Sequence, residues 1–340
     1  MTQDAESFLS RAWLRRGPTA TALWPLSLVF QSIAGSRRVL YRAGVLHAAR
    51  LPVPVVVVGN IFVGGTGKTP LTIWLVQELR RAGFVPGVIS RGYGGKSAAP
   101  AEVLASSAPE QAGDEPVLIA RRAQCPVVVG RRRVEAARSL LARHPEVNVI
   151  VSDDGLQHYA LARDVEIVLC DERGNGNGLL LPAGPLREPP SRPRDFTVYN
   201  AARPPAGAPS DAYRMQLVAD AAYCLSAPSN TLPLHALASG GQRIAAAAGI
   251  GNPSRFFAML RAAGLAVDEH PLADHYDFTD NPFARIDADI ILITEKDAVK
   301  CTRIDTINRD PRIRVVPVTA RIDRALAERI VEKCRGRPTA

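Results

Sequence analysis

From residue 55 onward, short runs rich in valine and isoleucine alternate with longer stretches in which apolar residues recur every three or four positions. The short runs are typical of buried strands, and the longer stretches are typical of helices that bury one face. The predicted strands occupy residues 55–58, 85–89, 126–129, 147–151, 165–170 and 196–199. The predicted helices occupy residues 68–82, 115–124 and 131–143. Because strands that alternate with helices form a parallel sheet covered on both faces, the pattern predicts an α/β fold.

The same alternation returns in the last third of the chain, after a stretch at residues 182–210 that is rich in Pro, Gly and Arg and predicts mostly loop. Two segments of alternating polarity, residues 213–218 and 221–225, predict a two-stranded ribbon. Beyond it we expect strands at 243–248, 289–294 and 313–318 and helices at 253–263 and from about residue 322. We therefore predict a core domain over residues 51–210 and a smaller C-terminal α/β domain over residues 211–340, joined by the ribbon.

The first 50 residues form a third part, with an apolar run at residues 20–33 between clusters of arginine. A helix needs about 20 apolar residues to cross a bilayer, and this run is shorter. Four apolar residues recur at steps of three and four and form one stripe: Leu23, Leu26, Phe30 and Ile33. An apolar stripe with basic flanks is typical of a helix that lies in the membrane interface. A helix packed on the protein and a cleaved signal peptide are the alternatives.

Composition and charge indicate an anionic partner and a reducing compartment, but they do not identify the partner. The chain has 340 residues, 46% of them hydrophobic, and a formal net charge of +9, which suits an anionic partner such as a nucleotide, a nucleic acid, a phospholipid or a phosphorylated substrate. Its five cysteines are widely spaced and include no C-x-x-C pair. This count argues against a disulfide framework and a structural zinc site, and it favours a reducing cytosol, where ATP is available.

A glycine-rich loop follows the first predicted strand and ends at the start of a predicted helix, with the sequence Gly64-Gly65-Thr66-Gly67-Lys68-Thr69. Backbone amides in such a loop surround phosphate oxygens, and the helix N-terminus adds its positive dipole end. Lys68 reaches the β- and γ-phosphates, and the Thr69 hydroxyl takes a magnesium site. Phe62 stands where the strict pattern has a glycine. The loop nevertheless predicts nucleotide phosphate binding, because Gly64 and Gly65 supply the turn.

Acidic residues stand at two further positions where a phosphate site needs them. Asp153 and Asp154 end a hydrophobic strand, and ligands of parallel sheets bind at that edge. One of them is expected to hold magnesium, although a turn at Asp154-Gly155 is the alternative. Asp114 precedes a helical run and is either a helix N-cap or a carboxylate that accepts a proton from an attacking hydroxyl.

Four polar residues carry no assignment from the pattern alone. His158 follows the acidic strand end in a predicted loop, and His275 is isolated in the second domain. Arg187 and Glu188 lie in the proline-rich stretch, where a surface salt bridge is the ordinary explanation.

Taken together, these segments resemble the tetraacyldisaccharide 4′-kinase family, the lipid A 4′-kinases of Gram-negative bacteria, over nearly the whole chain. The matching segments in the first half are Val58-Gly59-Asn60, Val63-Gly64-Gly65-Thr66-Gly67-Lys68-Thr69-Pro70, Ser90-Arg91-Gly92-Tyr93-Gly94 and Gly113-Asp114-Glu115-Pro116. Those that follow are Ser152-Asp153-Asp154-Gly155-Leu156-Gln157-His158, Leu181-Pro182-Ala183-Gly184-Pro185-Leu186-Arg187-Glu188, Gly249-Ile250-Gly251-Asn252-Pro253, Asp274-His275 and Thr294-Glu295-Lys296-Asp297-Ala298. The family also tolerates a residue other than glycine at the position of Phe62.

The resemblance implies transfer of the ATP γ-phosphate to the 4′-hydroxyl of a tetraacylated disaccharide 1-phosphate, with magnesium, at the cytoplasmic face of the inner membrane. It implies that Asp114 is the base, that His275 is its partner, and that Lys68 acts on the transferred phosphate. The expected nucleotide-binding residues are Phe62, Val63, Gly64, Gly65, Thr66, Gly67, Lys68, Thr69 and Arg187. The expected magnesium neighbourhood consists of Thr69, Asp153, Asp154 and Glu188. We expect no nucleic acid and infer no obligatory protein partner.

The main alternative is a P-loop switch protein, a regulatory ATPase or GTPase that hydrolyses nucleotide to move a partner. Switch ATPases with deviant loops carry a signature lysine just before Gly-Gly, where this chain has Val63. GTP-specific proteins carry N-K-x-D, and Glu295-Lys296-Asp297 does not fit it. A membrane adaptor with a degenerate site is less consistent still, because Lys68 and Thr69 are intact.

Overall fold

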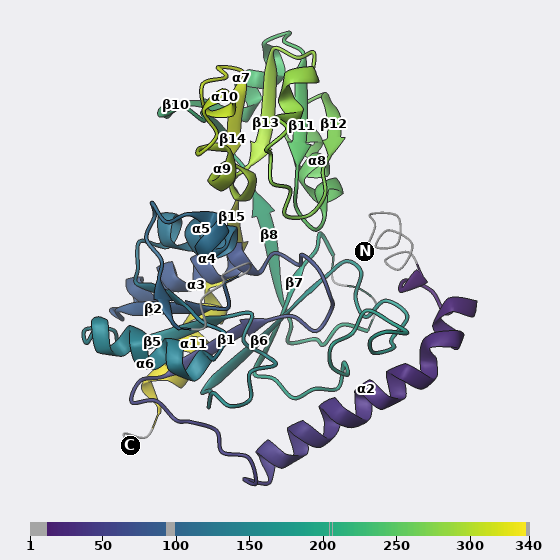
Figure 1. The fold of residues 1–340 in the computed structure, drawn as a ribbon, viewed down its shortest axis with the longest axis vertical. Helices are drawn as coiled ribbons and strands as arrows, with labels where there is room; N and C mark the ends of the chain where they lie inside the picture. The colour runs from purple at the N-terminus through teal and green to yellow at the C-terminus, as the bar shows by residue number, and fades with distance from the viewer. Residues whose placement is uncertain (1–11, 93–98, 204, 206, 338–340) are drawn as a thin grey trace.

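The computed structural model describes residues 12–92, 99–203, 205 and 207–337 and arranges them around two sheets, one above the other in Figure 1. The lower sheet has nine strands in the order β15-β8-β7-β6-β1-β5-β2-β4-β3. These strands are β1 (Val55–Gly59), β2 (Pro86–Ser90), β3 (Ala101–Glu102), β4 (Val127–Val129), β5 (Val149–Asp153), β6 (Val165–Asp171), β7 (Phe196–Asn200), β8 (Tyr213–Val218) and β15 (Thr319–Ile322). The pairings from β8 to β4 are parallel, and the edge strands β15 and β3 are antiparallel. The predicted α/β fold with a parallel sheet is confirmed.

The first strand shows why the interior strands of this sheet have unbroken apolar sequences. Val56 and Val58 belong to the hydrophobic cluster on one face, whereas Val55 and Val57 belong to the cluster on the other. Helices α3 (Lys68–Arg81), α5 (Asp114–Ala123) and α11 (Arg324–Arg335) contribute to the first cluster. Helix α6 (Arg133–Arg143) contributes to the second, and the short helix α4 (Pro109–Ala112) precedes α5.

The upper sheet has six strands in the order β10-β9-β14-β13-β11-β12. They are β9 (Ala221–Cys224), β10 (Ala227–Pro233), β11 (Ile244–Ala248), β12 (Val267–Pro271), β13 (Ile290–Thr294) and β14 (Ile313–Val316). The helical segments around them are α7 (Leu234–Ser239), α8 (Pro253–Ala262), η1 (Pro282–Arg285), α9 (Glu295–Cys301) and α10 (Asp305–Asn308). Strands β12, β11, β13 and β14 are parallel, so this unit repeats the α/β principle on a smaller scale.

One prediction for the C-terminal part is wrong, and another needs a small shift. The expected ribbon does not form, because β8 pairs with β7 and β15 in the large sheet while β9 pairs with β10 and β14 in the small one. The helix predicted from about residue 322 is α11, which begins at Arg324. Strand β15 precedes it and ends at Ile322, because Ala320 packs into the first cluster and Ile322 packs against it. The chain therefore returns to the large sheet through β15 and α11. The domain boundary at residue 210 stays a prediction. Residues 319–335 lie beyond that boundary but pack with the large sheet.

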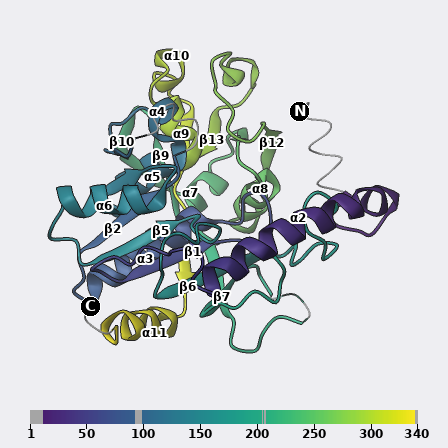
Figure 2. The same ribbon diagram turned by 60° about the horizontal axis from the view of Figure 1, so that its bottom comes forward.

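Helix α2 (Pro18–Arg42) extends beyond the predicted apolar run at both ends. It lies along the lower right of the molecule in Figure 1 and on the right in Figure 2. Its contact with the body is narrow, because only Ala20 and Ser27 are buried, although Phe30 also packs against the second cluster. Most of its large apolar side chains are exposed: Trp24, Leu26, Leu28, Val29, Ile33, Val39 and Leu40. Within the described residues, no helix is long and apolar enough to cross a membrane.

Candidate active site

The candidate site lies where five neighbouring parallel strands end. In the order β7, β6, β1, β5 and β2, their last residues are Asn200, Asp171, Gly59, Asp153 and Ser90. Because the carboxyl ends of parallel strands meet at one edge of a sheet, polar residues from distant parts of the chain come together there.

The loop between β1 and α3 is held in shape by two asparagines that sequence reasoning missed. The Asn60 amide donates to the Gly64 carbonyl at 3.1 Å, and its Oδ1 accepts from Lys68 Nζ at 3.1 Å. The Asn200 amide donates to the Thr66 carbonyl at 2.9 Å. Gly67 has a φ of 95°, and a Cβ there would lie 2.5 Å from Asn200 Nδ2, so the position requires glycine. Asn60 stands in the matched segment Val58-Gly59-Asn60, whereas no signal in the sequence marked Asn200.

Phe62 joins this loop to the proline-rich stretch. Its ring is buried beneath the Arg173 guanidinium, 4.3 Å from the ring centroid, and the residue forms an isolated bridge with Leu186. The neighbouring Val63 amide donates to the Pro185 carbonyl at 2.9 Å. The side chain that departs from the glycine pattern therefore anchors the loop.

Asp154 stands between the loop lysine and an arginine of the proline-rich stretch. Its Oδ1 lies 3.6 Å from Lys68 Nζ and 3.3 Å from Arg187 Nη1. Burial raises the pKa of Asp154, but the charges of Lys68 and Arg187 outweigh burial and hold the pKa below its usual range. Arg187 is therefore part of the acidic strand end and not a surface pair.

Asp153, the last residue of β5, is almost fully buried. Its two carboxylate oxygens accept from Thr72 Oγ1 at 3.2 Å and from Ser90 Oγ at 3.1 Å. Burial, together with the charges of Glu115 and Asp154, raises the pKa of Asp153. The hydrogen bonds from Thr72 and Ser90 therefore hold Asp153 at the end of β5.

Glu188 takes part in a separate network. Its carboxylate accepts from Gln157 Nε2 at 2.9 Å, from Arg192 Nε at 2.7 Å and from the Tyr159 hydroxyl. Thr69 is buried at the first turn of α3. Among the described residues, no group of three or more His, Cys, Asp or Glu side chains has the arrangement of a metal site. Magnesium does not need such a group, since it is commonly held by one or two carboxylates and the substrate phosphates.

Asp114 and His275 meet across the two sheets. His275 Nδ1 donates to Asp114 Oδ2 at 3.0 Å, and Lys300 Nζ lies 3.2 Å from the same oxygen. Burial raises the pKa of Asp114, but the hydrogen bond from His275 and the charges of Lys296 and Lys300 outweigh it and hold the pKa well below its usual value. The same hydrogen bond raises the pKa of His275. The N-cap alternative for Asp114 is wrong, because the cap of α5 is Gly113.

Helix α9 brings two lysines to this pair that sequence reasoning missed. Besides the Lys300 contact, Lys296 Nζ lies 3.0 Å from Glu115 Oε1 and 3.9 Å from Asp114 Oδ2. The matched segment Thr294-Glu295-Lys296-Asp297-Ala298 contains the signal for Lys296. Nothing in the pattern showed that Lys300, one helical turn later, faces the same carboxylate.

The segment before α8 packs directly on the phosphate loop. A Cβ added to Gly251 would lie 2.9 Å from the Gly65 nitrogen, so only glycine permits this approach. Arg255 Nη2 lies 3.5 Å from Asp171 Oδ2 and also pairs with Glu172. The unit around the small sheet therefore contributes the Gly251 backbone and the Arg255 charge beside the loop, in addition to His275.

His158 is half-buried close to the acidic strand end. Burial and the charges of Arg133 and Arg91 lower the pKa of His158 to about 4, so the ring is neutral at ordinary pH. Tyr93 and Gly94 of the matched segment at residues 90–94 lie outside the described residues.

The site has the parts of a P-loop: a strand, a glycine-rich loop and a helix N-terminus around Lys68. Carboxylates stand at the end of the neighbouring strand β5. These features define a P-loop nucleotide-binding protein. The chain belongs to the tetraacyldisaccharide 4′-kinase family, because the family model LpxK, tetraacyldisaccharide-1-P 4′-kinase, matches residues 19–335. The resemblance seen in the sequence is thereby confirmed.

Relatives and a solved structure agree with this family. The tetraacyldisaccharide 4′-kinase of Herminiimonas arsenicoxydans is 60% identical over 98% of this chain and 97% of its own length. That of Janthinobacterium sp. (strain Marseille) is 60% identical over 99% of this chain and 98% of its own. A crystal structure of LpxK from Aquifex aeolicus in complex with ATP is 28% identical and superposes with a TM-score of 0.75, covering 93% of this chain and 98% of that one.

Proposed function

We propose that this protein transfers the γ-phosphate of ATP to the 4′-hydroxyl of a tetraacyldisaccharide 1-phosphate, which makes it an ATP-dependent lipid kinase of lipid A biosynthesis. The names of the relatives support the reaction, and the ATP complex of the Aquifex aeolicus protein supports the nucleotide. The observation that carries the proposal is the Asp114–His275 hydrogen bond beside an intact phosphate loop. A switch protein needs no such proton-accepting pair.

The test is transfer of radiolabelled γ-phosphate from ATP to the disaccharide acceptor. A 4′-kinase labels the acceptor and consumes little ATP without it. Steady ATP hydrolysis with no acceptor, and no labelled lipid when acceptor is added, would instead support the switch protein.

Phosphate binding falls to the loop and its cationic neighbours. The backbone amides of residues 64–67 face the phosphates, and Phe62 and Val63 anchor the loop beside them. Lys68 and Arg187, which both pair with Asp154, supply positive charge. Phosphoryl transfer depends mainly on positioning and charge stabilisation, so these groups carry much of the catalytic effect.

The donor set fits a magnesium ion. The Thr69 hydroxyl and the Asp154 carboxylate are oxygen ligands of the kind magnesium takes, and the Asp154 side chain is 31% exposed. Asp153 orients this strand end, because Thr72 and Ser90 already occupy its oxygens. When bound, the metal neutralises charge on the phosphates. Glu188 acts indirectly, because its hydrogen bonds with Gln157 and Arg192 steady the segment that carries Arg187.

Asp114 takes the proton of the 4′-hydroxyl, and His275, whose Nδ1 donates to Oδ2, orients the carboxylate. Lys296 and Lys300 keep Asp114 ionised, and ionisation is the state in which the carboxylate accepts a proton. The low pKa of Asp114 makes it a weak base by itself, so the hydrogen bond from His275 is needed to hold the carboxylate in position for the proton.

Helix α2 attaches the protein to the cytoplasmic face of the inner membrane, where a tetraacylated acceptor lies. Its exposed apolar side chains and the basic residues Arg37, Arg38 and Arg42 support an interfacial helix. Each apolar side chain buried in lipid contributes about 2 kcal/mol. Neither nucleic acid nor an obligatory protein partner is part of this proposal.

A further inference from the structure

A cavity lies between the C-terminal turns of α2 and the starts of β6 and β7. Its volume is about 510 Å³. Arg38, Tyr41 and Arg42 of α2 form one wall, and residues 48, 159, 161–163, 166 and 192–195 form the others. None of the residues that bind ATP or the metal in the proposed function lines this cavity. Helix α2, which we assign to the membrane, therefore also borders a cavity that opens to the molecular surface.

The lining of this cavity is strongly cationic. Five arginines face two carboxylates, which leaves a net charge of 5 − 2 = +3. The arginines are Arg38, Arg42, Arg163, Arg192 and Arg194, and the carboxylates are Glu166 and Asp195. Both carboxylates already have cationic partners, since Glu166 pairs with Arg163 and Arg192 and Asp195 pairs with Lys333.

Three of the five arginines are available to a ligand. Within the described part of the chain, Arg42 pairs with no carboxylate and is exposed. Arg194 donates to the Pro190 carbonyl, which carries no net charge. Arg38 approaches a carboxylate only at 3.9 Å, that of Glu188. Arginines so placed attract an anion, and the planar guanidinium matches the geometry of a phosphate.

Aromatic rings form another wall and connect the cavity to the active site. Tyr41 and Tyr159 have ring centroids 5.9 Å apart, and the guanidinium of Arg163 lies 5.4 Å from the Tyr159 ring centroid. The Tyr159 hydroxyl donates to Glu188, whose neighbour Arg187 pairs with Asp154. A ligand that contacts Tyr159 is therefore linked through one hydrogen bond to Glu188, the neighbour of Arg187.

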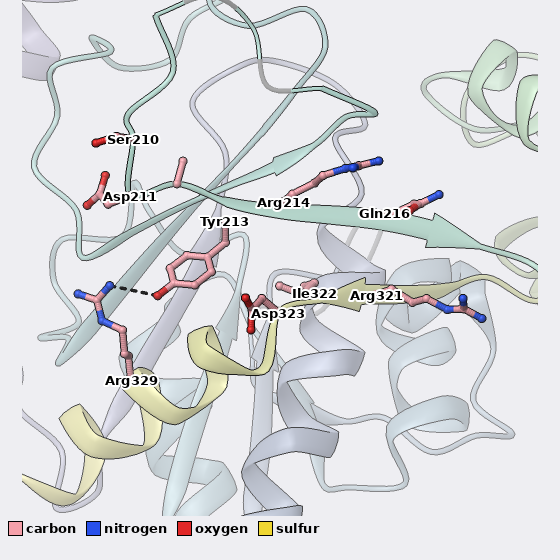
Figure 3. A pocket seen from close by; sticks show the side chains of 10 residues that line it. Ser210, Asp211, Tyr213, Arg214, Gln216, Arg321, Ile322, Asp323 and Arg329 are labelled. Carbon is pink, nitrogen blue, oxygen red and sulfur yellow. Dashed lines mark hydrogen bonds between the residues drawn. The ribbon is translucent and has the colours of Figure 1, made fainter.

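Another cavity, at the edge of the large sheet, lacks these properties. Arg214, Arg321 and Arg329 line it with Asp211 and Asp323, so its net charge is only 3 − 2 = +1. Arg321 and Arg329 point to opposite ends, and Arg329 bonds with the Tyr213 hydroxyl at 3.1 Å (Figure 3). The concentration of charge beside α2 is therefore not a general consequence of a basic chain.

The geometry points to a phosphate-binding subsite in the cavity beside α2, formed by Arg38, Arg42 and Arg194, that takes a phosphate group carried by a lipid in the membrane interface. This inference rests on the proposed function, because it needs α2 at the membrane. Two lipids supply the same chemistry there: the acceptor, through its 1-phosphate, and an anionic phospholipid, through its headgroup.

The test compares Arg42→Ala with Arg37→Ala, a matched control on the same helix whose exposed arginine does not line the cavity. In the first arm, KM is measured in neutral detergent for the acceptor and for the same acceptor without its 1-phosphate. In the second, binding is measured to vesicles of zwitterionic phospholipid, alone or mixed with anionic phospholipid. Losing one arginine–phosphate contact is expected to weaken the affected interaction about tenfold in Arg42→Ala.

A rise in KM for the acceptor alone, with kcat unchanged, supports the subsite and identifies the 1-phosphate. A selective loss of binding to anionic vesicles supports it and identifies the phospholipid. Arg42→Lys should recover part of either effect, because it restores the charge without the planar fork. If Arg42→Ala and Arg37→Ala behave alike in both arms, the subsite does not exist. Absence of transfer by the wild-type protein would refute the proposed function instead, while the vesicle arm still tests the subsite.

Discussion

At the scale of single residues, the loop lysine and threonine carry the plainest expectation. Lys68→Ala removes a charge held at the phosphate site by Asn60 and Asp154, and Thr69→Ala removes a hydroxyl ligand. Each change is expected to lower kcat by about 10²–10³-fold, the usual cost of losing a preorganised electrostatic contact. Steady-state transfer assays measure it, with Lys333→Ala on α11 as a control lysine. A Lys68→Ala protein with the wild-type kcat would refute the loop assignment.

The Asp114–His275 pair predicts strong coupling. Asp114→Asn and His275→Ala should each lower kcat by about 10²–10⁴-fold, the usual worth of general-base assistance, and should leave ATP binding nearly intact. Because the two groups share one hydrogen bond, the double variant should be little worse than the poorer single variant. Losses that multiply fully in this double-mutant cycle would show that the residues act independently.

The same pair predicts an unusual titration. The carboxylate of Asp114 stabilises the imidazolium, so the pKa of His275 is raised above its ordinary value of 6.5. The ion pair therefore contributes fully to stability below pH 6.5, and this contribution is lost as the pH rises through the raised pKa. An NMR titration of the His275 ring should give a pKa above 6.5 that falls in Asp114→Asn. An unchanged pKa in that variant would mean that Asp114 does not hold the proton.

These residues also mark the limit of sequence reasoning. Four of the site residues stand next to predicted strands: Lys68, Thr69, Asp153 and Asp154. Because ligands bind at the carboxyl ends of parallel strands, this position was enough to predict that they meet at one edge of the sheet. Asp114 and His275 are 275 − 114 = 161 residues apart, and no periodicity connects them. The family resemblance connected them, and the 3.0 Å hydrogen bond agrees with that expectation.

At the scale of elements, interior strands were predictable because both of their faces are buried, which produces unbroken runs such as that of β1. Short edge strands give weaker signals, and β3 and β15 were not predicted. The false ribbon has a related cause, because alternation in a segment reports which face is buried but not which strand lies beside it. Strands β8 and β9 both alternate, yet they pair in different sheets.

Helix α2 gives the prediction at this scale. Leu26→Gln, Val29→Gln and Ile33→Gln combined should release much of the protein from membranes and raise KM for the lipid acceptor more than KM for ATP. The three side chains are 57–67% exposed, so their replacement should leave the melting temperature close to that of the wild type. Vesicle flotation measures the effect, with Gln31→Ala and Ser36→Ala as the exposed polar control on the same helix. Undiminished flotation of the triple variant would mean that the anchor lies elsewhere.

At the scale of the whole molecule, activity depends on how the small sheet rests on the large one. Ion pairs join the two units, notably Arg122 with Glu295 at 2.6 Å and Lys296 with Glu115 at 3.0 Å. These contacts and the backbone approach at Gly251 together fix the position of His275. The approach at Gly251 is the most demanding of them, since it brings backbone against backbone and tolerates no side chain.

Gly251→Ala tests this arrangement. The added Cβ would lie 2.9 Å from the Gly65 nitrogen, and because that neighbour is backbone it cannot turn aside as a flexible side chain does. The small unit must therefore shift away from the loop and carry His275 with it, and a displacement of about 1 Å at a catalytic group costs about 10²-fold in rate. We expect kcat to fall to that extent while the melting temperature changes little. Gly240→Ala in the same unit is the control, because its nearest neighbour lies at 3.4 Å and its φ is −79°. A Gly251→Ala protein as active as Gly240→Ala would show that catalysis does not depend on this approach.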